Sequence, residues 1–108
     1  MATKIYTKTQ NEGDTFTGAT FYGSGNYTLV GATAKMQFRK DKKDGVLLQT
    51  WDLNAGLTVL NDLDIALDQQ LFTLPAGVYY SDLEITLANG LKETPVSIVW
   101  NVQQTVTQ

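Results

Sequence analysis

The chain has 108 residues with a formal net charge of −3, and it contains neither histidine nor cysteine. These absences remove thiol nucleophiles, Ser-His triads, Cys/His zinc sites and disulfide bonds from the expected chemistry. Acid–base catalysis would depend on carboxylates with shifted pKa values, because no other side chain titrates near neutrality. A chain of this length is expected to form one domain that buries about two-thirds of its unfolded surface, enough for a core without disulfides.

The charge balance and the apolar pattern also argue against two kinds of partner. Nucleic-acid binding needs clustered basic residues, whereas this chain has 8 basic and 11 acidic residues. No apolar run approaches the roughly 20 residues of a membrane helix, and the polar segment Met1–Asn11 is not expected to be a signal peptide. We therefore expect no nucleic acid, no membrane partner and no enzymatic activity, and the lack of cysteine fits folding in a reducing cytoplasm.

Short strands separated by turn residues are predicted along the whole chain, with no convincing helix. The alternation is clearest over Ala34–Arg39, where every second side chain is apolar. In chain order, strands are expected at Lys4–Thr9, Thr15–Phe21, Ala34–Arg39, Val46–Trp51, Leu57–Leu60, Tyr79–Leu87 and Val96–Thr107, with turns or loops at Asn11–Asp14, Gly23–Asn26, Asp41–Gly45 and Asn54–Gly56. Leu71–Leu74 leads into the last pair of strands. Phe16 and Phe21 are out of step and do not share one face of their strand.

Two segments need separate treatment. Asn61–Asp68 predicts a short strand or an irregular connector, with a helical turn as the alternative, because apolar and polar residues alternate there only briefly. Pro95 is expected at a sheet edge or a bulge, since proline has no backbone N–H to donate to a ladder.

A hairpin near the C-terminus is the clearest structural signal. Alternation over Tyr79–Leu87 is followed by Asn89–Gly90, a pair typical of a type I′ turn because both central residues need positive φ. Tyr79 and Tyr80 should point to opposite faces, so at least one of them is exposed or at an interface.

These elements predict an all-β fold, with a two-layer antiparallel sandwich favoured and a small barrel as the alternative. We expect a single domain over residues 1–108. Residues 1–12 are expected to form either an edge strand of that domain or an N-terminal arm that pairs with a neighbouring copy. The predicted core consists of Ala34, Met36, Phe38, Leu47, Trp51, Leu57, Leu83, Ile85, Leu87, Ile98 and Trp100.

Four segments carry a resemblance to a known group of proteins. They are GDTFTGATF at Gly13–Phe21, LVGATAKMQFRK at Leu29–Lys40, LPAGVYYSDLEITLANG at Leu74–Gly90 and VWNVQQTVT at Val99–Thr107. Their order resembles the small immunoglobulin-like structural proteins of phage and prophage virion gene clusters, and the N-terminal domain of some baseplate upper proteins. Two departures from that group are Ser81, where an aromatic residue usually sits, and Pro95 with Val96, which replace a more regular Thr-rich strand.

The resemblance implies an immunoglobulin-like antiparallel β-sandwich with a non-enzymatic structural or adaptor role in a bacteriophage particle. The position would be a capsid decoration, neck, tail or baseplate, so the protein would be made in the host cytoplasm and located in the virion. The implied partners are other virion proteins and further copies in a homo-oligomer. The group shares no active site, so no catalytic, cofactor-binding or metal-ligating residue is implied.

Two other function classes remain as alternatives. A carbohydrate- or cell-surface-binding module would expose coplanar aromatic side chains. A small hydrolase would require carboxylates that face one another across a cleft.

Two groups of acidic residues are candidate sites. Asn61, Asp62, Asp64 and Asp68 resemble a sparse set of oxygen ligands for calcium, but the EF-hand spacing with its glycine and terminal glutamate is missing. Solvated carboxylates on the outer face of a connector are therefore the favoured interpretation.

Asp82 and Glu84 share one face of a predicted strand, which suggests the paired carboxylates of a glycoside hydrolase. Their alternation with Tyr80 and Thr86 favours a solvent-exposed face instead.

The remaining candidates are basic or aromatic. Lys40, Lys42 and Lys43 form a basic cluster that acidic residues interrupt, and a hairpin tip is the favoured interpretation over a phosphate site. Trp51 and Trp100 would suit a sugar-stacking platform, but their in-phase positions favour the core.

Overall fold

The computed structural model describes residues 3–23 and 28–104, which form ten strands and no helix. The strands are β1 (Lys4–Asn11), β2 (Thr15–Phe16), β3 (Ala19–Tyr22), β4 (Thr33–Lys40), β5 (Leu47–Leu53), β6 (Gly56–Val59), β7 (Asp64–Leu67), β8 (Gln70–Leu71), β9 (Gly77–Thr86) and β10 (Lys92–Gln103). The predicted all-β class is therefore confirmed. Within the described ranges, no helix is long and apolar enough to cross a membrane.

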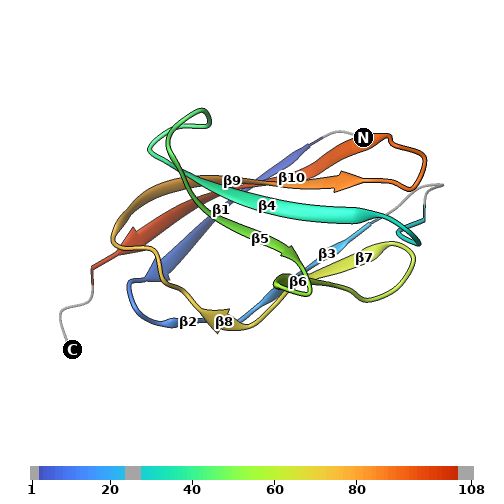
Figure 1. Ribbon diagram of the computed structural model, residues 1–108. Coiled ribbons are helices and arrows are strands. Elements are labelled where there is room, and N and C mark those ends of the chain that lie inside the picture. Colours follow the sequence, from blue (N-terminus) through green and yellow to red (C-terminus); the bar gives the residue numbers. More distant parts are fainter. Residues whose placement is uncertain (1–2, 24–27, 105–108) are drawn as a thin grey trace.

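Eight of these strands form one mixed sheet in the order β1-β10-β9-β4-β5-β6-β7-β3, and β2 pairs with β8 separately. The sheet curls after β5, so that β6, β7 and β3 lie beneath β4, β9 and β10 (Figure 1). The prediction of a purely antiparallel arrangement is wrong, because β1 runs parallel to β10 and β5 runs parallel to β6. Strand direction depends on which strands become neighbours, and local alternation carries no information about that.

Most of the predicted strands appear with similar bounds, and the uncertain segment Asn61–Asp68 contains a short strand, β7. The predicted strand Thr15–Phe21 is divided into β2 and β3. Gly18 lies between them with φ of +93°, a conformation that favours glycine, and a Cβ at this position would lie 3.2 Å from the Leu67 carbonyl oxygen. This break places Phe16 and Phe21 in different strands and explains why they are out of step.

The C-terminal hairpin is confirmed, but its turn differs from the predicted type I′ geometry. Asn89 does not take positive φ, whereas Gly90 has φ of +90°. The Gly90 N–H donates to the Leu87 carbonyl at 2.8 Å, and the Asn89 side chain accepts from the Leu91 N–H at 3.0 Å. This is the pattern of a three-residue loop that ends in a left-handed glycine.

Pro95 lies at a bulge, as predicted. The register between β9 and β10 shifts between Glu93 and Val96. The ladder with β1 begins at Val96, opposite Lys4. The missing N–H of proline therefore falls where the ladder is already interrupted.

The core is organised around a cluster of large aromatic rings. Phe16, Phe38, Trp51 and Phe72 each lie within 6.1 Å, centroid to centroid, of another ring in the cluster, and Phe16, Phe38 and Phe72 contact Trp100 at 5.2–5.4 Å. Of the predicted core, the buried members are Ala34, Met36, Phe38, Trp51, Leu57, Leu83, Ile85 and Trp100. Leu87 and Ile98 are half-buried and pack against this core.

Leu47 was predicted in the core, and this is wrong because its exposed fraction is 42%. The β4–β5 register shifts after Phe38, so that Leu47 pairs with Arg39 instead of with a core residue. A one-residue shift moves every later side chain to the other face of the sheet.

Several core residues were not predicted: Phe16, Leu29, Ile65, Leu67, Phe72, Leu74, Tyr79, Val96 and Val102. Most belong to short strands or connectors, where alternation is too brief to identify a face. Parts of three predicted elements lie outside the described residues, namely 24–26 of the loop, 105–107 of the last strand and 1–2 of the N-terminal segment.

Candidate functional site

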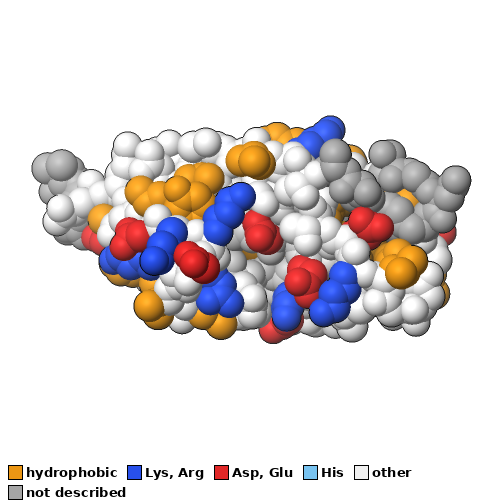
Figure 2. Space-filling model, turned by 90° about the horizontal axis from the view of Figure 1, so that it is seen from above, with side chains coloured by type: hydrophobic (Ala, Val, Ile, Leu, Met, Phe, Trp, Pro, Cys, Tyr) orange, Lys and Arg blue, Asp and Glu red, His pale blue; other side chains and the backbone are white. Residues whose placement is uncertain are grey.

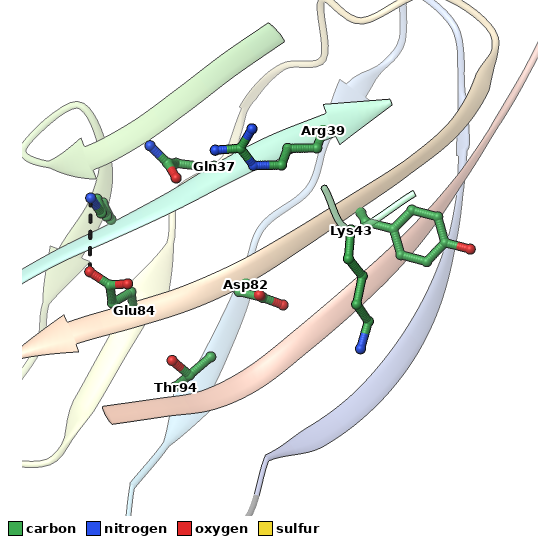
Figure 3. A pocket seen from close by; sticks show the side chains of 8 residues that line it. Gln37, Arg39, Lys43, Asp82, Glu84 and Thr94 are labelled. Atoms are coloured by element: carbon green, nitrogen blue, oxygen red, sulfur yellow. Dashed lines mark ion pairs between the residues drawn. The ribbon is translucent and has the colours of Figure 1, made fainter. Parts of the chain in front are cut away.

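A shallow polar depression of about 90 Å³ lies on the outer face of β4, β9 and β10 (Figure 3). Its lining residues are Lys35, Gln37 and Arg39 from β4, Lys43 from the β4–β5 turn, Tyr80, Asp82 and Glu84 from β9, and Thr94 from β10. Figure 2 shows this face from above, with basic and acidic side chains interspersed over it. The strands place these residues here because alternate positions point away from the core.

The two carboxylates of this depression already have partners. Glu84 Oε1 lies 3.8 Å from Lys35 Nζ and 4.0 Å from Lys92 Nζ. The Ser97 hydroxyl donates a hydrogen bond to Asp82. These groups lie beside one another along the outer face, as the alternation predicted, whereas a glycosidase needs carboxylates that flank a bound sugar.

The acidic residues of the calcium hypothesis are used locally and lie apart. Asp64 accepts from the Asn61 side-chain amide at 2.8 Å, and Asp68 accepts from the Thr58 hydroxyl at 2.8 Å. They flank opposite ends of β7, four residues and about 13 Å apart along the strand. Among residues 3–23 and 28–104, no three acidic side chains are grouped so that they could hold a metal ion.

The basic cluster lies at the tip of the β4–β5 hairpin, as predicted. Lys40 ends β4, and Lys42 and Lys43 follow in the turn. Arg39 donates to the Gly45 carbonyl at 3.1 Å and ties the turn to its strand. Asp41 and Asp44 interrupt the positive charge, so the turn does not form a uniform basic patch.

Both tryptophans are buried, which confirms the core interpretation. Trp51 is 3% exposed and Trp100 is 0% exposed. Their rings meet at 82° with centroids 6.0 Å apart. Neither ring can stack on a sugar, because stacking needs a flat and exposed aromatic face.

A larger apolar groove of about 540 Å³ opens between β1 and β3, the two end strands of the eight-stranded sheet. The buried side chains of Phe16, Leu67, Val96 and Trp100 form part of its lining, together with half-buried Ile98. An apolar groove of this size at a sheet edge is typical of a binding surface for another chain.

Aromatic side chains also line both sides of the groove. Tyr6 of β1 and Tyr22 of β3 are 52% and 76% exposed, and half-buried Phe21 lies beside them. Sequence reasoning did not single out these residues as a site. The available signals were Ile5 and Tyr6 in an otherwise polar strand, and the out-of-step Phe21.

Comparison with known proteins adds no assignment. No protein-family model matches this chain, and no curated protein matches it.

Proposed function

We propose that this protein is a non-enzymatic structural or adaptor protein of a bacteriophage particle, with an immunoglobulin-like β-sandwich as its fold. It works by protein–protein contacts with other virion proteins and with further copies of itself. It is made in the host cytoplasm and resides in the virion, as a decoration, neck, tail or baseplate component. The four-segment resemblance over Gly13–Thr107 supports this proposal.

The strand order supports the immunoglobulin-like part. Immunoglobulin folds place strands G, F, C and C′ in one sheet and strands B, E and D in the other. Here β10, β9, β4 and β5 are consecutive neighbours, and β3, β7 and β6 form a second run. A two-residue ladder joins the two runs, with Asp52 opposite Gly56 and Leu53 opposite Leu57.

A second supporting feature is the buried phenol near the start of β9. The Tyr79 hydroxyl donates to the Pro75 carbonyl at 2.6 Å, four residues upstream. Immunoglobulin-like sandwiches carry such a tyrosine at the start of strand F, two residues before a cysteine. Ser81 occupies that second position here and accepts the Trp100 indole N–H at 2.7 Å.

The observation that carries the functional part is the open side of the sheet. β1 and β3 each have one edge without a strand partner in the described chain, and the apolar groove lies between them. Unpaired edges next to exposed aromatic side chains favour pairing with another polypeptide. The carbohydrate-binding alternative gains no support from the tryptophans, since both are buried.

Mass spectrometry of purified particles tests this proposal. The particles come from the bacterium whose genome encodes the chain, induced to release phage. We expect the protein to co-purify with intact particles at a fixed copy number relative to the major capsid protein. A matched culture with the gene deleted should release particles that lack one structural feature in electron micrographs. Absence of the protein from infectious, morphologically complete particles would overturn the proposal.

A further inference from the structure

The free edge of β3 is the first of three features that point to a strand acceptor. β3 pairs with β7 from Ala19, opposite Leu67, to Tyr22, opposite Asp64, and it ends the strand order. In an antiparallel pair, half of the backbone N–H and C=O groups point away from the partner strand. The outward-pointing N–H and C=O groups of β3 face no other strand within residues 3–23 and 28–104. An added strand would satisfy them.

The groove beside this edge has the shape and polarity that an added strand needs. Its volume is about 540 Å³, and its lining includes the apolar side chains of Phe16 and Ile98 together with residues of β3. Figure 1 labels β1 and β3, both drawn in shades of blue. A strand paired with β3 would project every second side chain onto these apolar residues and cover them.

Charge identifies the kind of strand. Among the residues that the structure describes, Lys4 and Lys8 line the groove and no aspartate or glutamate does. They occupy the same face of β1 as Tyr6, opposite Val96 and Trp100 of β10. Neither lysine forms an ion pair with any described residue. The inner face of β1 therefore presents a cation, an aromatic ring and a second cation at two-residue intervals.

We propose that this groove accepts an acidic, extended segment of a partner protein, which pairs with β3 as an additional strand. The segment carries carboxylates four residues apart with an apolar residue midway between them, which complements Lys4, Tyr6 and Lys8. This inference rests on the proposed function as an adaptor and names the chemistry of its partner. Apolar burial and the two ion pairs both contribute to affinity, and the charges also set orientation and association rate.

A second copy of this chain is a poorer occupant. Its end strand β1 carries two lysines and no carboxylate, so docking β1 of another copy would place lysines against Lys4 and Lys8. Its other end strand, β3, has no charged residue and would leave both lysines unpaired. Like charges at short range disfavour the first arrangement.

The test uses the full chain and a capped synthetic peptide, Thr-Glu-Thr-Val-Thr-Glu-Thr, titrated while backbone amide NMR signals are followed. We expect shifts confined to β3, β1 and the adjoining part of β10. The matched peptide with glutamine in place of both glutamates should bind more weakly. Lys4→Gln combined with Lys8→Gln should weaken binding by about 2- to 30-fold, from two exposed ion pairs. Added salt should erase that difference.

The control is Lys42→Gln combined with Lys43→Gln, which removes two positive charges from the β4–β5 turn and should leave affinity unchanged. Ala19→Glu and Ala19→Lys form a second pair at an exposed β3 position, and they should weaken and strengthen binding respectively. Thermal melts of every variant verify folding.

Three results would overturn the inference: no shifts at millimolar peptide, shifts outside the groove, or equal affinity for the glutamine peptide. A homodimer mapped to β3 would also overturn it, because a second copy would then occupy the edge. Failure of peptide binding with the protein present in particles refutes this inference alone. Peptide binding with the protein absent from particles refutes the proposed virion role alone.

Discussion

At the residue scale, the buried hydrogen bond between Trp100 and Ser81 gives a reason for a serine at position 81, where the virion proteins that the sequence resembles usually have an aromatic residue. Ser81 is 2% exposed and lies between Phe38 of β4 and Ile98 of β10. Its hydroxyl accepts the Trp100 indole N–H at 2.7 Å. A buried indole without a partner loses its hydration and gains nothing in return. The serine thus lets a tryptophan with a polar N–H lie at the centre of an apolar cluster.

Ser81→Ala should destabilise the protein by about 1–3 kcal/mol, because it leaves the Trp100 N–H buried and unpaired. Urea unfolding followed by tryptophan fluorescence measures this change. Ser97→Ala is the matched control, since that hydroxyl serves an outer-face carboxylate, Asp82. A larger loss from the Ser97 variant would contradict the assigned role of Ser81.

Tyr79 gives the protein a predicted sensitivity to alkaline pH. Burial raises the pKa of the Tyr79 phenol above its ordinary value of about 10, and the carboxylates of Asp41 and Glu12 raise that pKa further. Because the pKa of Tyr79 is higher in the folded state than in the unfolded state, the neutral phenol contributes to the free energy of unfolding. This contribution is fully present below about pH 10 and is lost as pH rises through the folded-state pKa.

Tyr79→Phe should lower the free energy of unfolding by about 0.5–1.5 kcal/mol at pH 7, through loss of the hydrogen bond to Pro75. The difference between wild type and variant should then shrink above about pH 10. Urea midpoints across pH 7–11 measure both effects. Tyr80→Phe, on the opposite face of the same strand, is the control. If the stability difference between wild type and Tyr79→Phe grew with pH, the upward direction of the Tyr79 pKa shift would be refuted.

At the element scale, β4 and β9 show how strongly a period of two specifies a central strand. Met36 pairs with Leu83 and Ala34 with Ile85 on the buried face, while Lys35 pairs with Glu84 on the outer face. Both strands have neighbours on each side, so alternation alone determines which face is buried. β5 follows the same period except at its first residue, Leu47, which the β4–β5 register shift places on the exposed face.

Phe38→Ala and Ile85→Ala should each cost about 2–5 kcal/mol, because each removes buried volume from a small core. Lys35→Ala and Glu84→Ala should stay within about 0.5 kcal/mol as outer-face changes to a weak ion pair. Denaturant midpoints provide the comparison. The reverse ordering would mean that the strand phases are displaced by one residue.

At the scale of the whole molecule, β1 contributes many backbone pairings and little core. It pairs with β10 over eight residues, from Lys4 opposite Val96 to Asn11 opposite Gln103. Gln10 is its sole buried side chain within the described chain. The segment after it is anchored more firmly, since Glu12 accepts the Ala76 N–H at 2.7 Å. The first strand is therefore an addition at the edge of a core that the other strands build.

Deletion of residues 1–12 should leave a folded protein with a lower melting temperature. The aromatic core lies in the other strands, but the edge of β10 loses its partner and the Glu12 anchor is lost. Circular dichroism melts measure stability, and light scattering measures self-association through the exposed β10 edge, which we expect to increase. Complete unfolding of this variant would show that β1 is required to form the sheet.

Local information in the sequence determined the all-β class, the faces of β4 and β9, the two hairpins and the bulge at Pro95. Alternation, turn residues and the missing proline N–H act within a few residues, so no long-range contact is needed to predict them. Tertiary structure alone decided that β1 pairs in parallel with β10, that Phe16 and Phe72 join Trp100, and that Leu47 turns outward. These outcomes depend on which distant strands become neighbours, and many pairings are compatible with the same alternation. The open groove arises likewise, because no strand of the described chain follows β3 in the sheet.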